Sequence, residues 1–344
     1  MSGAVLRVDL ARIRANLDTL RARVAPADVM FVVKDDAYGH GVDAVVRTAT
    51  AAGIDWFGSF SIATGVRVRA AAPTARIFAW ATSPAAEVDE AIDARLELGV
   101  GDAGYLDLVA TRAAGRGIRV HLKIDTGLHR NGVRPEDWPA FVARAAALEA
   151  AGDIVVTGIW SHIAEASDAD DDRARAEFER AVDLARAAGL TPGVRHLAAS
   201  AAGHARPEFR NDLVRFGAFG YGVRSADGPA LPGIVPAAAL VAPVVRLDGD
   251  TVVVGLGALD GLPSTLGGRV SVGTPAGARA LRRVDLAESA VEAWPDAQVG
   301  DEVTFFGPGA HGESDPTTLG EAIDTVGEEV LVRVSPLVPR EYSG

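Results

Sequence analysis

Residues 29–41 of the chain read Val-Met-Phe-Val-Val-Lys-Asp-Asp-Ala-Tyr-Gly-His-Gly. The apolar run Val29–Val33 is typical of a buried strand, and Lys34 follows at its end. A polar turn with Tyr38 and two glycines comes next. A lysine at the mouth of a barrel is what an enzyme needs to hold an aldehyde cofactor as a Schiff base. Because a lysine at a strand end is also commonly a plain cation, the rest of the chain has to decide between these two interpretations.

The first two-thirds of the chain alternates β-rich runs with helical segments. The helical segments place apolar residues three and four positions apart, as in Asp172–Ala188. Strands that are each followed by a crossover predict an α/β fold with an N-terminal TIM (β/α)8 barrel, and a doubly wound sheet is the alternative. The predicted strands are Met30–Lys34, Trp56–Phe60, Arg76–Ala81, Leu96–Val100, Val120–Asp125, Val155–His162, Arg195–Ser200 and Leu213–Gly217.

The character of the sequence changes from about Pro236 onward. Short valine-rich runs separated by glycine turns predict a C-terminal all-β domain. The segment Arg224–Pro236 is rich in Gly, Pro, Ser and Asp, so we expect a barrel over residues 1–228 and a β domain over residues 229–344. One helix is expected at Thr318–Val326. The predicted strands are Val241–Leu247, Thr251–Val254, Arg269–Val272, Ala278–Asp285, Glu302–Phe306 and Val330–Val334.

Composition excludes several classes of function. The formal net charge of −12 and the lack of a basic run make a nucleic-acid partner improbable on electrostatic grounds. With 0 cysteines, the chain has no disulfide, no thiolate metal site and no cysteine nucleophile. No other spacing typical of a metal site is present, so we expect no metal.

Localisation is predicted from two further observations. The amino terminus Met1–Leu10 carries Arg7 and Asp9 and lacks the apolar core of a signal peptide. The longest apolar run, Ile234–Val245, contains two prolines and is shorter than the ~20 residues that a membrane helix needs. We therefore expect a cytoplasmic protein without a membrane segment.

Polar residues gather at the carboxyl ends of the predicted barrel strands, where enzymes of this fold carry their chemistry. This position recurs in five of the strands, which random surface charge would rarely produce. The residues concerned are Lys34; Lys123, Asp125, His129 and Arg130; Ser161 and His162; Ser200; and Arg215 and Gly217, with Tyr221 shortly after.

The residue types support anion binding, although each has a plainer interpretation. Ser200, Gly217 and Tyr38 suit a phosphate, but Ser200 could equally cap a helix and Gly217 relieve packing. Arg130 could hold a substrate carboxylate with two hydrogen bonds, or be a surface cation. A buried Lys123 would need a partner or a chemical modification. His162 is either a core residue or one that faces a ligand.

Together these motifs resemble the alanine racemase family of fold-type III pyridoxal-phosphate enzymes. The resemblance covers nearly the whole chain, and its first two motifs are long and ordered. The segments that carry it are Val33–Gly41, Lys123–Gly132, Gly158–His162, Ala199–Ala202, Val214–Gly222 and Ser335–Arg340.

The resemblance implies a pyridoxal 5'-phosphate cofactor and roles for the residues around it. Lys34 would form the Schiff base and act as one acid/base in interconverting L- and D-amino acids. Tyr38, Ser200 and Gly217 would bind the phosphate, and Tyr221 would also bind the cofactor. Arg215 would contact the pyridine nitrogen, and His162 would support the cofactor or Arg215. Arg130 would bind the substrate carboxylate, and a carbamylated Lys123 would orient Arg130. A homodimer with sites built across the subunits and a small-molecule amino-acid substrate are also implied.

The sequence departs from the family pattern in its C-terminal part. Racemases of the family use a second base, a tyrosine, and Ala258 stands at that position. Leu286-Ala287 stands where the family has Met-Asp, and Glu328 where it has a phosphate-binding tyrosine. Three hypotheses follow: a racemase with another second base (Asp260, Asp285 or His311), an enzyme of another reaction such as decarboxylation, aldol cleavage or β-elimination, or a cofactor-binding paralogue without catalysis.

Overall fold

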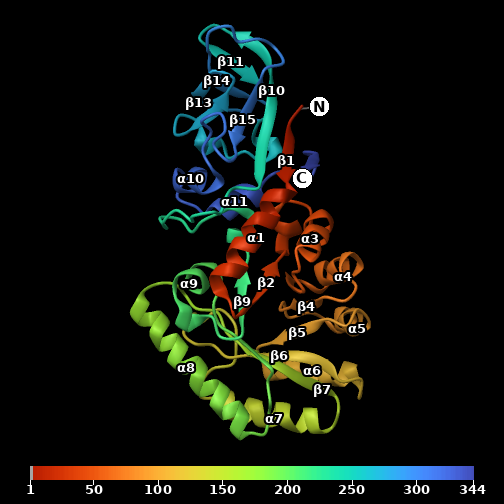
Figure 1. Ribbon diagram of the computed structural model, residues 1–344. Coiled ribbons are helices and arrows are strands. Elements are labelled where there is room, and N and C mark those ends of the chain that lie inside the picture. Colours follow the sequence, from red (N-terminus) through yellow and green to blue (C-terminus); the bar gives the residue numbers. More distant parts are fainter. Residues whose placement is uncertain (1–2) are drawn as a thin grey trace. The chain divides into compact units, whose positions relative to one another are not determined.

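The computed structural model describes residues 3–344 and divides into two compact units (Figure 1). The barrel unit comprises Leu20–Lys34 and Ala49–Gly217. The β unit comprises Met1–Thr19, Asp35–Thr48 and Ala218–Gly344. The division is discontinuous in sequence, because short N-terminal segments belong to the β unit. The two units are divided at residues other than the predicted domain boundary at 228/229, which stays a prediction.

The barrel unit is built on one parallel sheet with the order β8-β7-β6-β5-β4-β3-β2-β9. The sheet closes between β8 and β9, where the Asp212 N–H donates to the Arg195 carbonyl (3.2 Å) and the Arg215 N–H to the Ala198 carbonyl (3.3 Å). The strands are β2 (Asp28–Val32), β3 (Trp56–Phe60), β4 (Arg76–Ala79), β5 (Glu97–Val100), β6 (Ile118–Lys123), β7 (Ile154–Trp160), β8 (Val194–His196) and β9 (Leu213–Phe216).

Helices lie outside this sheet, as Figure 1 shows for α4–α8. Several begin at a side chain that accepts an otherwise unpaired N–H: Ser61 for α4, Asp102 for α6 and Ser167 for α8. The barrel interior holds Met30, Trp56, Phe78, Trp160 and Leu213. The helices are α4 (Ile62–Ala71), α5 (Ala85–Asp93), α6 (Ala103–Ala113), α7 (Trp138–Ala150), α8 (Asp168–Ala187), α9 (Ser200–Ala205) and η1 (Pro207–Phe209); α1 (Leu10–Val24), α2 (Lys34–Tyr38) and α3 (Val42–Ala51) have residues in both units.

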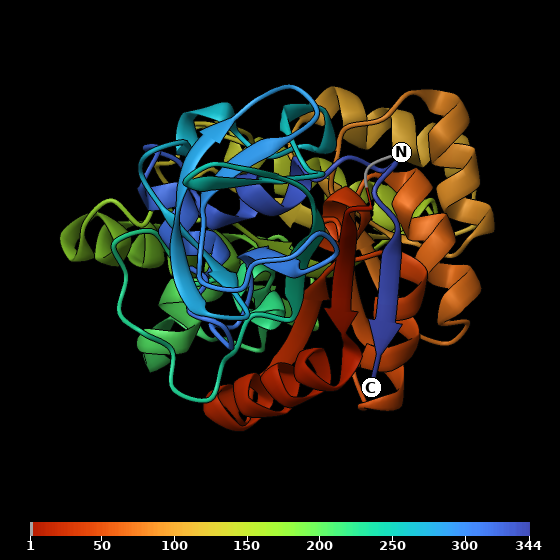
Figure 2. The ribbon, with the colours of Figure 1, turned by 90° about the horizontal axis from the view of Figure 1, so that it is seen from above.

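The β unit holds an eight-stranded sheet with the order β11-β14-β13-β12-β15-β10-β1-β16. An additional β11–β10 pairing closes six of these strands into a barrel. The N-terminal β1 and C-terminal β16 lie side by side and parallel (Figure 2). The elements are β1 (Val5–Asp9), β10 (Ala238–Asp248), β11 (Thr251–Val254), β12 (Ser271–Thr274), β13 (Gly277–Val284), β14 (Ser289–Glu292), β15 (Glu302–Phe306), β16 (Arg340–Ser343), α10 (Pro316–Glu321), α11 (Gly327–Val332) and the short helices η2 (Ala218–Tyr221), η3 (Ala258–Asp260) and η4 (Ser264–Leu266).

The predicted fold class, a TIM barrel followed by an all-β domain, is confirmed. Each of the eight predicted barrel strands corresponds to a strand of the sheet. One prediction is wrong: Val330–Val334 is not a strand, because most of it lies in α11. Valine favours strands, yet Val330 and Leu331 are buried one helical turn from Gly327, which shows packing overriding propensity. No helix among residues 3–344 has the length and apolarity to cross a membrane.

Candidate active site

The turn after Lys34 has an unusual backbone. Four successive non-glycine residues, Asp35 to Tyr38, have φ between 52° and 57°, in the left-handed region. This conformation costs roughly 1–2 kcal/mol per residue, so α2 is not an ordinary right-handed helix. The turn is held by Gly39 N–H to Asp35 O and Gly41 N–H to Asp36 O, both 2.9 Å. Strain of this kind concentrates at functional sites.

Four cationic side chains of the barrel unit surround His162. Lys34, Lys123, Arg130 and Arg215 all act electrostatically to lower the pKa of His162. Burial is the largest cause, and together these effects bring this pKa to about 3, so the imidazole is neutral. The sequence placed these residues at three different strand ends, and the structure brings them together. Such a concentration of positive charge favours anionic ligands.

Lys123 is buried at the end of β6, with 4% of its surface exposed. Burial, followed by the charges of Arg130 and Arg215, lowers the pKa of Lys123 to about 8. The Nζ atom lies 4.4 Å from the centre of the Trp160 ring. A neutral fraction of this amine is therefore available near physiological pH, which is the form that reacts as a nucleophile.

The loop that follows Lys123 is organised by Asp125. Its carboxylate accepts hydrogen bonds from the N–H groups of Gly127 and His129, both 3.0 Å, and pairs with His129 Nδ1 at 3.0 Å. Burial alone would raise the pKa of Asp125, but these bonds outweigh it and lower the pKa. A Cβ on Gly132 would lie 2.8 Å from Asp125 N, so the loop requires glycine there. Arg130 extends from this loop and is exposed.

Arg215 is held in the barrel by neutral acceptors. Its Nη1 donates to His196 Nδ1 and to the His196 carbonyl, both 2.9 Å, and its Nη2 to the carbonyls of Ser161 (2.8 Å) and Leu197 (2.9 Å). Nη2 also lies 3.3 Å from His162 Nδ1. Burial, then Arg130, lowers the pKa of Arg215 to about 9, so the guanidinium still carries its charge at neutral pH.

The residues predicted to bind phosphate fall in both units. In the barrel unit, Gly217 directly follows β9, and its N–H donates to Ser200 Oγ at 3.3 Å. In the β unit, Tyr38 and Tyr221 are buried, with ring centres 4.9 Å apart. Burial raises the pKa of both phenols, and the Glu328 carboxylate raises that of Tyr38 further. Both hydroxyls are therefore protonated and able to donate.

The sequence interpretation missed two features of the site. Lys34 and Lys123 are the two lysines of the whole chain, whereas arginine supplies the other basic side chains of the Lys+Arg total of 34. A count of lysine against arginine would have revealed this. The other missed feature is a row of buried polar side chains, Glu97, His121 and His196, beneath Arg215. These residues lie inside strands, where nothing in the local pattern marks them as functional.

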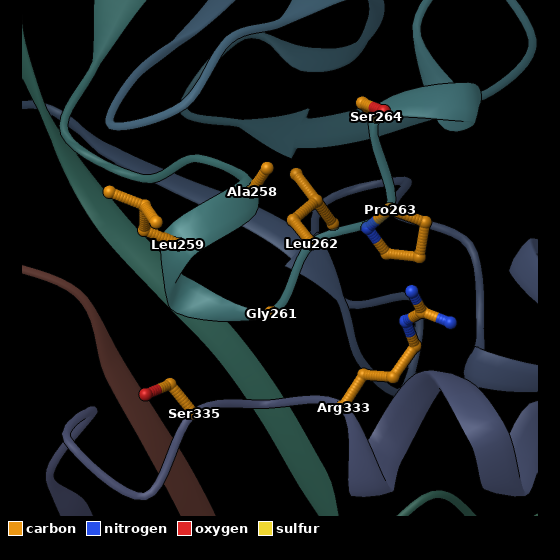
Figure 3. A pocket seen from close by; sticks show the side chains of 8 residues that line it. All are labelled: Ala258, Leu259, Gly261, Leu262, Pro263, Ser264, Arg333 and Ser335. Carbon is orange, nitrogen blue, oxygen red and sulfur yellow. The ribbon is translucent and has the colours of Figure 1, made fainter.

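The region around Ala258 in the β unit contains a pocket of about 480 Å³ (Figure 3). Its lining residues are Ala258, Leu259, Gly261, Leu262, Pro263, Ser264, Arg333 and Ser335. None of these carries a carboxylate, imidazole or phenol. Asp260 accepts a hydrogen bond from the Gly257 N–H (2.9 Å), and Asp285 pairs with Arg283 at 2.8 Å. The structure thus gives both of these proposed second bases a structural partner.

Comparisons with known proteins agree on one family. The family model of the alanine racemase N-terminal domain matches residues 8–225. The alanine racemase of Thermobifida fusca is 39% identical, with 100% of this chain and 99% of the relative covered. That alignment extends over 369 positions, more than the 344 residues here, so the relative has segments that this chain lacks.

Two further relatives show the same similarity over the full length. The alanine racemase of Beutenbergia cavernae is 37% identical, with 98% of this chain and 97% of the relative covered. The crystal structure of alanine racemase from Streptomyces lavendulae superposes with a TM-score of 0.94 at 33% identity, covering 100% of this chain and 98% of that one. The chain therefore belongs to the alanine racemase family of pyridoxal-phosphate-dependent isomerases.

Proposed function

We propose that this protein is a pyridoxal-phosphate-dependent amino-acid racemase that uses Lys34 to carry the cofactor and to move the substrate α-proton. The observation that carries this proposal is the gathering of the chain's two lysines with Arg130 and Arg215 around His162. Arginine cannot form an imine or a carbamate under these conditions, so lysine is required where such chemistry occurs.

The residues present fit the cofactor. The described ion pairs of residues 3–344 include none to Arg130, so its guanidinium is available to an anion. Arg130, Arg215 and the two lysines suit a phosphorylated, negatively charged cofactor and an amino-acid carboxylate. Tyr38, Ser200 and Gly217 are proposed to hold the phosphate, with Tyr221 packed against Tyr38. When bound, the cofactor would withdraw electrons from the substrate α-carbon and so acidify its proton.

Each protein group then has a defined task. Lys34 Nζ takes the α-proton from one face or returns it there. Arg130 binds the substrate carboxylate, and a carbamate on Lys123 would pair with Arg130 and keep it oriented. Arg215 keeps its own protons at neutral pH and would contact the ring nitrogen of the bound cofactor without protonating it. His162 supports Arg215 as a neutral acceptor.

We further propose a cytoplasmic homodimer with each active site completed by the partner subunit. Leu259 and Leu286, which are 70% and 71% exposed, and Leu337, which is 90% exposed, lie in the β unit and offer apolar surface for such contact. A small amino acid, with alanine as the first candidate, is the proposed substrate.

A second candidate function rests on Ala258. Without a tyrosine there, Lys34 could exchange the α-proton on one face alone. The chain would then catalyse α-proton exchange with retention of configuration, a decarboxylation or an elimination instead of racemisation. The pocket around Ala258 offers no carboxylate, imidazole or phenol among its lining side chains, which favours this alternative over one in which a neighbour substitutes for the tyrosine.

Chiral product analysis tests the proposal. The cofactor-loaded protein is incubated separately with L- and D-alanine, then with serine, lysine, ornithine and threonine, and both enantiomers are quantified. The proposal predicts conversion in both directions with at least one amino acid, and loss of it in Lys34→Arg. Consumption of an amino acid to a product other than its enantiomer would replace racemisation with the second candidate.

A further inference from the structure

A continuous row of hydrogen bonds runs through the barrel unit beneath Arg215. Arg215 Nη1 lies 2.9 Å from His196 Nδ1, and His196 Nε2 lies 2.8 Å from His121 Nδ1. His121 Nε2 lies 2.9 Å from Glu97 Oε2. The two histidines are 0% exposed and Glu97 is 1% exposed. The row connects β9, β8, β6 and β5, so it crosses the barrel from strand to strand.

The direction of every bond in this row is fixed by its two ends. A guanidinium can only donate, so His196 Nδ1 must accept and its proton resides on Nε2. That proton is donated to His121 Nδ1, which places the His121 proton on Nε2 as well. The last bond then points to an ionised Glu97. Both imidazoles are neutral, and burial, the largest cause, lowers the pKa of each.

Glu97 is held as a carboxylate at the far end. Arg76 donates to it through Nε (2.6 Å) and Nη2 (2.8 Å), and Thr157 Oγ1 donates at 2.9 Å. Burial alone would raise the pKa of Glu97, but the bonds from His121 and Arg76 outweigh it and lower the pKa. The row therefore ends at an ionised carboxylate, which Arg76 holds, and begins at Arg215.

Aromatic rings and a glycine pack closely against the two imidazoles. Trp160 stacks on His196, with ring centres 5.8 Å apart and planes at 7°, and Phe78 meets both imidazoles. A Cβ on Gly158 would lie 2.2 Å from His121 Nδ1, so glycine at this position is what admits the His121 ring. Buried histidines need only hydrogen-bond partners to be stable. This packing also fixes the orientation of both rings.

We propose that Glu97, His121 and His196 act together as a positioning relay that fixes the Arg215 guanidinium and supports its charge from a distance. A carboxylate in direct contact with Arg215 would cancel much of the positive potential that Arg215 presents at its free edge. A carboxylate reached through two neutral imidazoles offsets the cost of burying the cation and leaves that potential in place. The relay itself does not depend on the proposed function; its effect on the cofactor ring does.

The first test uses apoprotein with ¹⁵N-labelled histidine. Ring ¹⁵N shifts report which nitrogen is protonated, and single substitutions assign the signals. We expect both His121 and His196 to carry their proton on Nε2 and to stay neutral from pH 8.5 to pH 5.5. A proton on His196 Nδ1 would overturn the relay, since Arg215 could not then donate to that atom. The shifts are measured on the unmodified chain without catalysis, and the variants serve only to assign the signals.

The second test compares Glu97→Gln with Asp107→Asn, which neutralises an exposed carboxylate paired with Arg144 in the same unit. In Glu97→Gln we expect shifted ring signals of His196, two hydrogen bonds away, a changed pH dependence of the cofactor absorption, and kcat lowered about tenfold or more with KM nearly unchanged. Asp107→Asn should change none of these. If Glu97→Gln matches Asp107→Asn in the His196 signals and the cofactor absorption, the relay is refuted.

The two proposals fail in different ways. If the protein binds cofactor but racemises no amino acid, the proposed function fails. The histidine signals and the absorption change would still test the relay, and only the kcat comparison could not be made. A protein that racemises normally with an unperturbed His196 in Glu97→Gln would refute the relay and leave the proposed function standing.

Discussion

Lys123 Nζ lies 4.4 Å from the centre of the Trp160 ring and is almost fully buried. In the described part of the chain, residues 3–344, no carboxylate forms an ion pair with this ammonium. A cation–π contact contributes up to about 2 kcal/mol when desolvated, which is less than the several kcal/mol that burying an ammonium costs. Lys123 therefore needs either the neutral form or a change in its chemistry.

Carbamylation of Lys123 is a direct prediction. A neutral amine with a pKa near 8 reacts with carbon dioxide, and the resulting carbamate would be an anion beside Arg130 and Arg215. Protein equilibrated with ¹³C-bicarbonate should show one carbamate carbon signal. Because the chain has two lysines, Lys34→Arg should keep the signal and Lys123→Arg should lose it. A signal that survives in Lys123→Arg would place the carbamate elsewhere.

Covalent attachment of the cofactor should occur at Lys34 and not at Lys123. Borohydride reduction of cofactor-loaded protein, followed by peptide mass analysis, should give one modified peptide that contains Lys34. Lys34→Arg should lose both the modification and racemisation, the latter by about 10²–10⁴-fold or more, because an acid/base group is lost together with the attachment. Modification at Lys123 in the unsubstituted protein would reverse the assigned roles.

Ala258→Tyr tests whether the missing phenol limits inversion. The pocket of about 480 Å³ beside Ala258 leaves room for a larger side chain (Figure 3). If the rest of the site is complete, the ratio of inversion to α-proton exchange should rise by up to about 10²-fold. Val299→Tyr, at an exposed residue of the same unit that does not line this pocket, is the matched control and should leave the ratio unchanged. Equal ratios in both variants and the parent protein would show that Ala258 does not face the reacting carbon.

Stability of the apoprotein should fall in mild acid. Burial is the largest cause that lowers the pKa of His40 (to about 4), His162 (to about 3), His121 and His196. Each of these groups binds a proton near pH 6.5 when unfolded but not when folded, so the free energy of unfolding is at its full value about one pH unit above 6.5 and falls as the pH is lowered through 6.5. Each contributes up to about 1.4 kcal/mol per pH unit to that fall.

Urea unfolding at pH 8, 6.5 and 5.5 measures this effect. The free energy of unfolding should fall slightly from pH 8 to pH 6.5, where about half of each unfolded imidazole is protonated, and much further at pH 5.5, where carboxylates are still largely ionised. A free energy that stays constant or increases down to pH 5.5 would show that the buried histidines are already charged in the folded state.

The barrel could be predicted from sequence because its strands are near-continuous apolar runs between amphipathic helices. Apolar runs do not reveal strands that are short or that pair with residues far away in the sequence. Nothing near Val5–Asp9 indicates a strand that pairs with Ala238–Asp248, and Arg340–Ser343 is a polar edge strand. Val330–Val334 has strand-like composition, but packing places most of it in a helix.

The site was predicted as a set of residue types and not as a geometry. Lys34, Lys123, His162 and Arg215 lie at or just after the ends of predicted strands, and barrel topology alone brings such ends together. The left-handed turn after Lys34 could not be foreseen, since Ala37 and Tyr38 do not favour that conformation. The buried row from Arg215 to Glu97 depends on the register of four strands, which sequence patterns do not fix.

Proton NMR in D₂O shows whether Lys34 drives racemisation on this scaffold. Cofactor-loaded protein is given L-alanine and, separately, D-alanine, and loss of the α-proton signal is followed alongside chiral analysis. We expect α-deuterium in both enantiomers, formed from either starting material, and none with Lys34→Arg. Deuterium exchange with complete retention of configuration would contradict racemisation and show that Lys34 acts alone on one face.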